Sequence, residues 1–256
     1  MSITRHGAIA EAGRTRTSSR PDPAPIYIVC SPRRRVGKTL VSRLIAEYHL
    51  SEGRRIAAID LGDESPQLQD YLPKITTIAD IGDTRGQMAL FDGLLSDEDT
   101  PKVVDVSHRA FKDFFGVVQK IGLFEEARER GMETLMLFMV DQHPASAQAY
   151  QILSRWFTNA SLLPVHNHAV ATALPPRPEF KDDDTPDPLE IPLLRPPLRW
   201  QVDQHTFSFG KLREQISENL PVEIHIELES WTTSVFLQIT QIELALARYH
   251  AAMTAP

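Results

Sequence analysis

Residues 26–40 carry the clearest structural signal in the chain: Ile26-Tyr27-Ile28-Val29-Cys30-Ser31-Pro32-Arg33-Arg34-Arg35-Val36-Gly37-Lys38-Thr39-Leu40. The first five residues are apolar and rich in β-branched side chains, which predicts a buried parallel strand. A short polar loop follows and ends in Gly-Lys-Thr. Over residues 40–50 apolar side chains recur on one face, which predicts a helix. The segment therefore predicts a strand, a polar loop and a helix in direct succession.

This order is that of a phosphate-binding P-loop. The helix N-terminus would present free amides and a partial positive charge to a phosphate. Lys38 is expected to reach the terminal phosphates, and the Thr39 hydroxyl is expected to hold Mg²⁺. The alternative is a basic strand-to-helix turn that binds sulfate or nothing. The predicted nucleotide-binding residues of the loop are Arg34, Arg35, Val36, Gly37, Lys38, Thr39 and Leu40.

Length, charge and cysteine content restrict the class of protein. The chain has 256 residues, which suits one α/β domain with additions, and a formal charge of −7, which argues against a general nucleic-acid-binding surface. Cys30 is the only cysteine, which excludes an internal disulfide and favours a cytoplasmic protein. No apolar stretch approaches the ~20 residues of a membrane span. The sequence does not exclude a local contact with nucleic acid or a membrane surface, but no motif in it predicts one.

Strands and helices alternate along most of the chain. After the P-loop helix, strands are predicted over residues 54–60, 75–78, 102–107, 134–140 and 162–165, with helices over 68–72, 83–95, 108–130 and 145–157. Such alternation gives an α/β, mostly parallel sheet with helices on both faces, the three-layer sandwich of P-loop NTPases. Pro164 either argues against the strand over 162–165 or places that strand at an edge of the sheet.

The two ends of the chain differ in composition from the middle. Residues 1–25 are predicted to be a disordered basic tail, and residues 26–256 a P-loop NTPase-like domain. Residues 174–200 are rich in proline and predict an irregular excursion. Beyond it, the sequence predicts a helix over 207–220, a half-exposed strand over 222–228 and a helix over 231–253 with Ser230 as its cap. The C-terminal part is therefore predicted to be an α-β-α extension.

Acidic residues end two of the predicted strands. Asp60 and Asp105 fall where open α/β sheets place their ligands. Asp105 is the candidate for the metal-holding acid of P-loop proteins, or alternatively caps the next helix. Asp83 is similarly a helix cap or part of a switch loop. Thr39 and Asp105 are thus the metal residues predicted from position, whereas His166 and His168 lack a third ligand at recognisable spacing.

The loop resembles the deviant Walker A motif of the ParA/MinD-type ATPases, whose relatives include dethiobiotin synthetase and cobyrinate amidating enzymes. The family motif Lys-Gly-Gly-x-Gly-Lys-Ser/Thr falls on residues 33–39, and Gly37, Lys38 and Thr39 match it. Arg33 falls on the signature lysine, which in the family crosses a dimer to the partner's phosphates. Arginine can supply that charge in bidentate geometry. Arg34 and Arg35 stand where the family has glycines.

The resemblance implies roles for residues outside the loop. Lys38, Asp60 and Arg33 would be catalytic, with Asp60 handling the attacking water and Mg²⁺. The family's second aspartate falls on Gly62, with Asp63 next to it. Asn167 would read adenine, so ATP and Mg²⁺ are the expected cofactors.

Three functions follow from these observations. The first is a weak Mg²⁺-dependent ATPase that forms a nucleotide-dependent homodimer and acts on an unknown protein partner as a positioning or partitioning switch. The second is an ATP-dependent synthetase that activates a small carboxylate or carbamate. The third, favoured by the missing glycines, is a nucleotide-binding scaffold without turnover.

Overall fold

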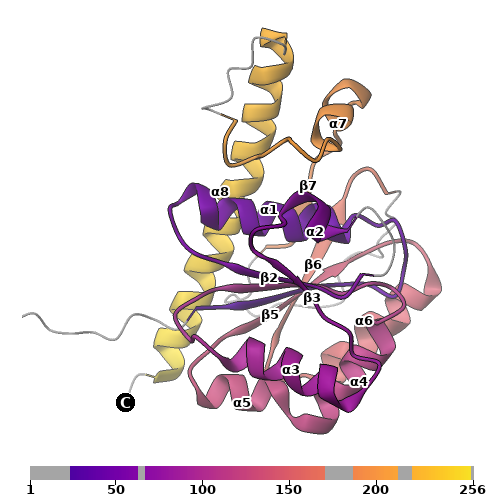
Figure 1. The fold of residues 1–256 in the computed structure, drawn as a ribbon, viewed down its shortest axis with the longest axis vertical. Coiled ribbons are helices and arrows are strands. Elements are labelled where there is room, and N and C mark those ends of the chain that lie inside the picture. Colours follow the sequence, from indigo (N-terminus) through magenta and orange to yellow (C-terminus); the bar gives the residue numbers. More distant parts are fainter. Residues whose placement is uncertain (1–23, 63–66, 171–186, 213–220, 255–256) are drawn as a thin grey trace, which may run out of the picture.

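The computed structural model describes residues 24–62, 67–170, 187–212 and 221–254. Within these residues one parallel sheet has the strand order β3-β2-β4-β1-β5-β6-β7 (Figure 1). Its strands are β1 (Ile26–Cys30), β2 (Ala57–Asp60), β3 (Thr76–Ile78), β4 (Lys102–Asp105), β5 (Thr134–Met139), β6 (Ser161–Asn167) and β7 (Leu189–Ile191). The predicted parallel α/β sheet is confirmed.

Helices cover both faces of this sheet, as predicted. One face is covered by α1 (Lys38–Ser51), α2 (Leu68–Tyr71), α7 (Pro196–Val202) and α8 (Val222–Thr254) (Figure 1). The other is covered by α3 (Thr84–Leu95), α4 (Phe111–Ile121), α5 (Leu123–Glu129) and α6 (Pro144–Trp156). Tyr27 and Val29 of β1 pack into the first core, and Ile26, Ile28 and Cys30 pack into the second. The three-layer sandwich of P-loop NTPases is therefore the fold.

The sheet topology brings the predicted functional residues together at the carboxyl ends of the strands. β1 lies between β4 and β5, so the loop that follows β1 leaves from the middle of the sheet. Val29 and Asp60 are both in register with Asp105. Because all the strands are parallel, the carboxyl ends of β1, β2 and β4 meet at the P-loop.

Two predicted capping alternatives are resolved by the structure. Asp83 caps α3, because its carboxylate accepts a hydrogen bond from the Gly86 amide at 2.7 Å. Asp105 does not cap the helix after β4, since the Ser107 hydroxyl accepts from the Ala110 amide instead. The single helix predicted over 108–130 is two helices, because Gly122 has a left-handed φ of 67° that ends α4.

The prediction that Pro164 marks an edge strand is wrong, because β6 lies between β5 and β7. Pro164 is in register with Phe138 of β5, whereas the pairing of β6 with β7 covers Val165 to Asn167. The proline therefore precedes the residues that pair on that side, and its missing amide interrupts no hydrogen bond there.

The α-β-α prediction for the C-terminus is also wrong. Residues 222–228 are the first two turns of α8, and Ser230 lies inside that helix instead of capping it. Residues 207–212 form no helix, and residues 213–220 lie outside the described residues. The alternation of apolar and polar residues over 222–228 is overridden by a longer helical pattern, in which apolar residues recur every three or four positions. Its members are Ile224, Leu228, Trp231, Val235, Ile239, Ile242 and Leu246.

Part of the predicted irregular excursion is regular structure. Residues 187–200 contribute β7 and most of α7, so the prediction is wrong for this part. Residues 174–186 lie outside the described residues, as do residues 1–23 of the predicted tail. None of the helices in the described ranges is both long and apolar enough to cross a lipid bilayer.

Candidate functional site

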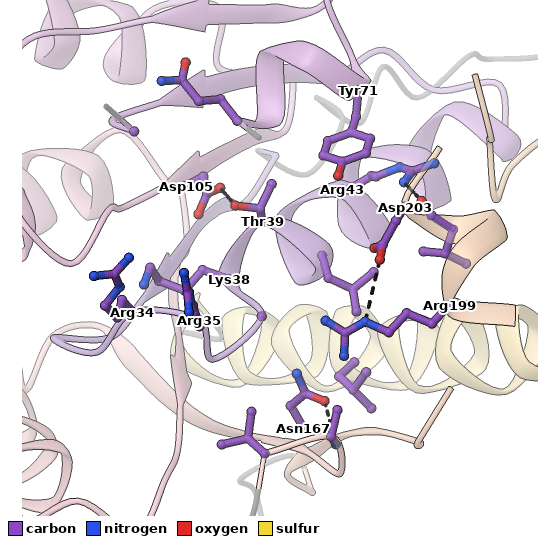
Figure 2. A pocket seen from close by; sticks show the side chains of 18 of the residues that line it. Arg34, Arg35, Lys38, Thr39, Arg43, Tyr71, Asp105, Asn167, Arg199 and Asp203 are labelled. Carbon is purple, nitrogen blue, oxygen red and sulfur yellow. Dashed lines mark hydrogen bonds and ion pairs between the residues drawn. The ribbon is translucent and has the colours of Figure 1, made fainter. Parts of the chain in front are cut away.

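A cavity of about 810 Å³ lies at the carboxyl edge of the sheet, above the N-terminus of α1 (Figure 2). Its wall is built by the P-loop, by the ends of β2, β4 and β6, and by residues of α2 and α7. The predicted nucleotide-binding residues that line it are Arg34, Arg35, Gly37, Lys38, Thr39, Leu40 and Asn167, whereas Val36 does not. Asp60 and Asp105 line it as well, so the fold assembles most of the predicted site in one place.

The P-loop backbone takes left-handed conformations at two positions. Gly37 has a φ of 97°, and a Cβ added to it would lie 2.4 Å from the Asn167 Nδ2 atom. Glycine is required here both by the backbone conformation and by this close approach. Arg35 has a φ of 58°, so an arginine occupies the kind of conformation that glycine normally supplies. The loop thus keeps a glycine-type backbone at position 35, although arginines stand at two of the expected glycine positions.

Lys38 lies across the loop with little exposure to solvent. Its Nζ atom donates to the carbonyl of Arg33 at 2.7 Å, and the residue is 9% exposed. Burial lowers the pKa of Lys38, against the opposing influence of Asp105 and Cys30. A poorly solvated ammonium group at a helix N-terminus would gain from an anionic ligand.

Thr39 and Asp105 form the candidate magnesium site. The Thr39 hydroxyl donates to Oδ2 of Asp105 at 2.7 Å, and Oδ1 of Asp105 is buried without a hydrogen-bond partner among the described residues. Burial, followed by the charge of Asp60, raises the pKa of Asp105 to about 7, although the Thr39 hydrogen bond opposes the rise. A buried carboxylate oxygen with no partner, beside a hydroxyl, fits a Mg²⁺ ion that is also held by phosphate.

The described residues contain no cluster of three or more His, Cys, Asp or Glu side chains that could hold a metal ion. A Mg²⁺ ion at Thr39 and Asp105 would therefore need oxygen atoms of a nucleotide and water to complete its shell. His166 and His168 both face Glu190, at 3.3 Å and 2.7 Å, and this contact accounts for them without a metal.

Asp60 is held by the turn that follows β2. Its two carboxylate oxygens accept from the amides of Gly62, at 2.7 Å, and Gln69, at 3.2 Å. A Cβ at position 62 would lie 2.7 Å from the Asp60 Oδ1 atom, so this turn favours glycine over any residue with a Cβ. Asp63 lies outside the described residues. The predicted catalytic and metal-binding roles of Asp60 stay predictions.

The three loop arginines differ in position. Arg33 is directed to Asp141 at the end of β5, with 3.3 Å between Nε and Oδ2, and is not part of the cavity wall. Arg34 and Arg35 are exposed and line the cavity beside Lys38 (Figure 2). The predicted catalytic role of Arg33 therefore has no support from its own cavity.

Asn167, the predicted adenine contact, braces the loop. Its Nδ2 atom donates to the carbonyl of Val36 at 3.0 Å, and its Oδ1 atom accepts from the amide of Ala169 at 3.0 Å. Val36 is buried below the loop and contributes its backbone to this contact. Contact with a base would need the side chain to exchange one of these bonds.

One wall of the cavity was not predicted from the sequence. Arg199 and Asp203 face the cavity from α7 and the residue after it, with 3.6 Å between them, and Tyr71 lies near them (Figure 2). The pair Pro196-Pro197 is typical of a helix start and could have indicated α7. No sequence signal placed this helix beside the P-loop.

Arg43 of α1 also lines the cavity and is almost fully buried. It bonds to Glu47 at 2.7 Å and to the carbonyl oxygens of Val202 and Phe207, and its guanidinium lies 4.6 Å from the centre of the Tyr71 ring. Charges spaced four residues apart on a helix normally indicate a solvated face. The sequence therefore gave no reason to place them in the core.

Comparison with known proteins adds one distant likeness. The sequence matches no protein-family model and no curated protein sequence. Among solved structures, a chain of the MinC:MinD cell division protein complex of Aquifex aeolicus is similar, with a TM-score of 0.39 and 14% sequence identity over 56% of this chain and 68% of that chain. The fold assignment rests on the strand order and on the P-loop between β1 and α1.

Proposed function

We propose that the protein binds a nucleoside triphosphate, expected to be ATP, together with Mg²⁺ in the cavity above α1, and that it hydrolyses the nucleotide slowly. The observation that carries this proposal is the Thr39–Asp105 pair, whose buried Oδ1 atom lacks a partner among the described residues and lies at the N-terminus of the P-loop helix. Lys38 adds a poorly solvated positive charge at the same helix end.

Each residue has a part in this proposal. The amides of the loop and Lys38 would bind the phosphates. Thr39 and Asp105 would hold Mg²⁺, which when bound neutralises charge on the phosphate oxygens. Asp60, next to Asp105 in the sheet, would orient the attacking water. Asn167 would brace the loop through its hydrogen bond to the Val36 carbonyl.

The direct test is a calorimetric and thermal-unfolding titration with ATP and GTP, with and without Mg²⁺. A ligand at one hundred times its Kd stabilises the folded state by about 2.7 kcal/mol. For a chain of this size that corresponds to a rise in Tm of about 5–10 °C. We expect this rise with ATP and Mg²⁺ and its loss in Lys38→Ala.

The matched control is Lys112→Ala, which removes an exposed lysine on α4, away from the cavity. This variant should respond as the unaltered protein does. The proposal fails if neither nucleotide shifts the Tm in the presence of Mg²⁺. Binding without phosphate release would leave the nucleotide-binding scaffold as the function.

We further propose that nucleotide state controls a homodimer, as in a positioning or partitioning switch. The supporting observation is that Arg33 is directed away from its own cavity and stays 40% exposed, as a residue that serves a partner's phosphates must be. Sedimentation with ATP and with ADP tests this. A monomer in both states would contradict the switch without affecting nucleotide binding.

A further inference from the structure

Three consecutive arginines precede Val36, and their surroundings differ. Arg33 is paired with Asp141, and its carbonyl oxygen accepts the Lys38 bond. Arg34 lines the cavity and is engaged with another group of the chain. Arg35 lines the cavity, is exposed, and makes no hydrogen bond or ion pair within the described residues. Its charge is thus available to a ligand.

The other cations of the cavity wall are already compensated. Arg43 is bonded to Glu47 and to backbone carbonyls, and Arg199 faces Asp203. Lys38 is bonded to a carbonyl and lies near Asp105. Within the described part of the chain, Arg35 is therefore the cavity-lining arginine whose charge has no partner.

The backbone of Arg35 gives a second, independent observation. Its φ of 58° is left-handed, a conformation that disfavours residues with a Cβ and that glycine adopts freely. Strained backbone of this kind persists where the surroundings impose it, and it concentrates at ligand sites. Glycine would adopt this backbone conformation without strain. The presence of arginine at position 35 therefore indicates a role for its charged side chain.

The position of Arg35 indicates which part of a nucleotide it meets. It precedes Lys38 by three residues and lies beside it at the phosphate end of the cavity, away from the Arg199 end (Figure 2). A guanidinium group suits the oxygen atoms of a phosphate because it can donate two parallel hydrogen bonds.

We infer that Arg35 contacts the terminal phosphate of a nucleoside triphosphate bound in its own protomer, an inference that rests on the proposed function. In hydrolysis, the water oxygen bonds to the terminal phosphorus while the bond to the bridging oxygen breaks. The products are a nucleoside diphosphate and inorganic phosphate, and the proton of the water passes to phosphate or solvent. Arg35 neutralises the negative charge of the oxygens during this transfer.

The first test compares affinities for a non-hydrolysable triphosphate, β,γ-imido-ATP, and for ADP, both with Mg²⁺. In Arg35→Gly the affinity for the triphosphate should fall at least about tenfold, as expected for the loss of a charge-assisted hydrogen bond, while the affinity for ADP changes little. Arg35→Lys should recover part of the loss. The matched control Lys112→Ala, which removes an exposed positive charge on α4 away from the cavity, should keep the ratio of the two affinities.

Stability separates this role from a structural one. Glycine relieves the left-handed strain at position 35, so Arg35→Gly should have a Tm equal to or above that of the unaltered protein. Loss of triphosphate affinity in a variant of undiminished stability is the expected result. An unchanged ratio of triphosphate to ADP affinity in Arg35→Gly overturns the inference.

The second test asks whether the contact is made within one protomer. Arg35→Gly is mixed with an excess of Lys38→Ala, which keeps Arg35 but lacks the phosphate-binding lysine. If Arg35 acts within its own protomer, the triphosphate affinity of the mixture stays low, and its recovery would show a contact across a dimer. Absence of any nucleotide binding by the unaltered protein would instead contradict the proposed function.

Discussion

At the scale of single residues, Asp105 combines the proposed Mg²⁺-binding role with a penalty for stability. Its carboxyl group is fully buried, and burial raises its pKa from 3.8 to about 7. Between about pH 4 and pH 7 the folded protein keeps a proton that the unfolded chain releases, so stability falls as pH rises through this range. Above pH 7 the whole penalty applies, which is about 4 kcal/mol for a shift of this size.

We predict that Asp105→Asn raises the stability of the nucleotide-free protein at pH 8 by up to about 4 kcal/mol, because the uncharged amide avoids the buried charge. The gain should shrink at pH 5, and the Mg²⁺-dependent nucleotide response should disappear. Urea unfolding at both pH values measures this. The control is Asp113→Asn on the exposed side of α4, which should change neither quantity. A loss of stability at pH 8 would contradict the prediction.

At the scale of elements, α1 is the helix that connects the cavity to the rest of the fold. It is buried on the side that faces the sheet and also on the side that faces α8 and residues 207–210. Glu243 of α8 ties these elements together, since it accepts from the hydroxyls of Tyr27 at 3.0 Å and Tyr48 at 2.9 Å, and forms two bonds of 3.0 Å with Arg54. The position of the P-loop helix thus depends on a residue far along the chain.

His49 belongs to the same cluster and makes it sensitive to acid. Its ring is fully buried, and burial lowers its pKa to about 4, although Glu243 opposes this. Because the unfolded chain binds a proton below pH 6.5 and the folded protein does not, stability is lost as pH falls from about 6.5 to 4. Tyr27, Tyr48, Arg54 and Glu243 are the titratable groups that face this ring.

We predict that Glu243→Ala lowers the free energy of unfolding by about 2–3 kcal/mol, because two hydroxyls and a guanidinium lose their shared acceptor. Glu243→Gln should lose less, since it keeps one acceptor. The matched control is Gln241→Ala on the exposed side of the same turn, which should stay within about 0.5 kcal/mol. Chemical denaturation measures all three, and equal effects of Glu243→Ala and Gln241→Ala would refute the assigned role.

At the scale of the whole molecule, α8 completes the core on the α1 side. It buries Leu228, Trp231, Val235, Ile239, Ile242 and Leu246 in the same core as the P-loop helix. Each such side chain contributes about 1.5–3 kcal/mol when buried. Their sum is comparable with the whole net stability of a domain, which is about 5–15 kcal/mol.

We therefore predict that a chain ending at residue 220 does not reach a fixed tertiary structure. Near-ultraviolet circular dichroism should lose its signal, and a hydrophobic dye should bind the exposed core. The control lacks residues 1–23, for which the sequence predicts no apolar face, and should keep the native signal. A native spectrum from the chain without α8 would show that this helix is an appendage.

The sequence by itself determined the strand, loop and helix over residues 26–51 and the parallel direction of the strands, but not their order in the sheet. These depend on patterns that lie within short windows: an apolar run, a Gly-Lys-Thr turn and a helical repeat. Asp60 and Asp105 were singled out by their places at strand ends, because the carboxyl ends of parallel strands meet at one side of the sheet, whereas Asn167 was singled out by the family resemblance.

Only the tertiary structure decided which charges are buried and which arginine lines the cavity. Arg43 and Glu47 lie in the core because residues 202–210 cover α1, and residues 222–228 are helical because their apolar side chains meet that core. Arg33 and Arg35 are alike in sequence, yet Asp141 holds one away from the cavity and a left-handed backbone directs the other to its wall. The burial of a charged side chain and the direction in which it points depend on partners far along the chain. Local sequence periodicity carries no information about such partners.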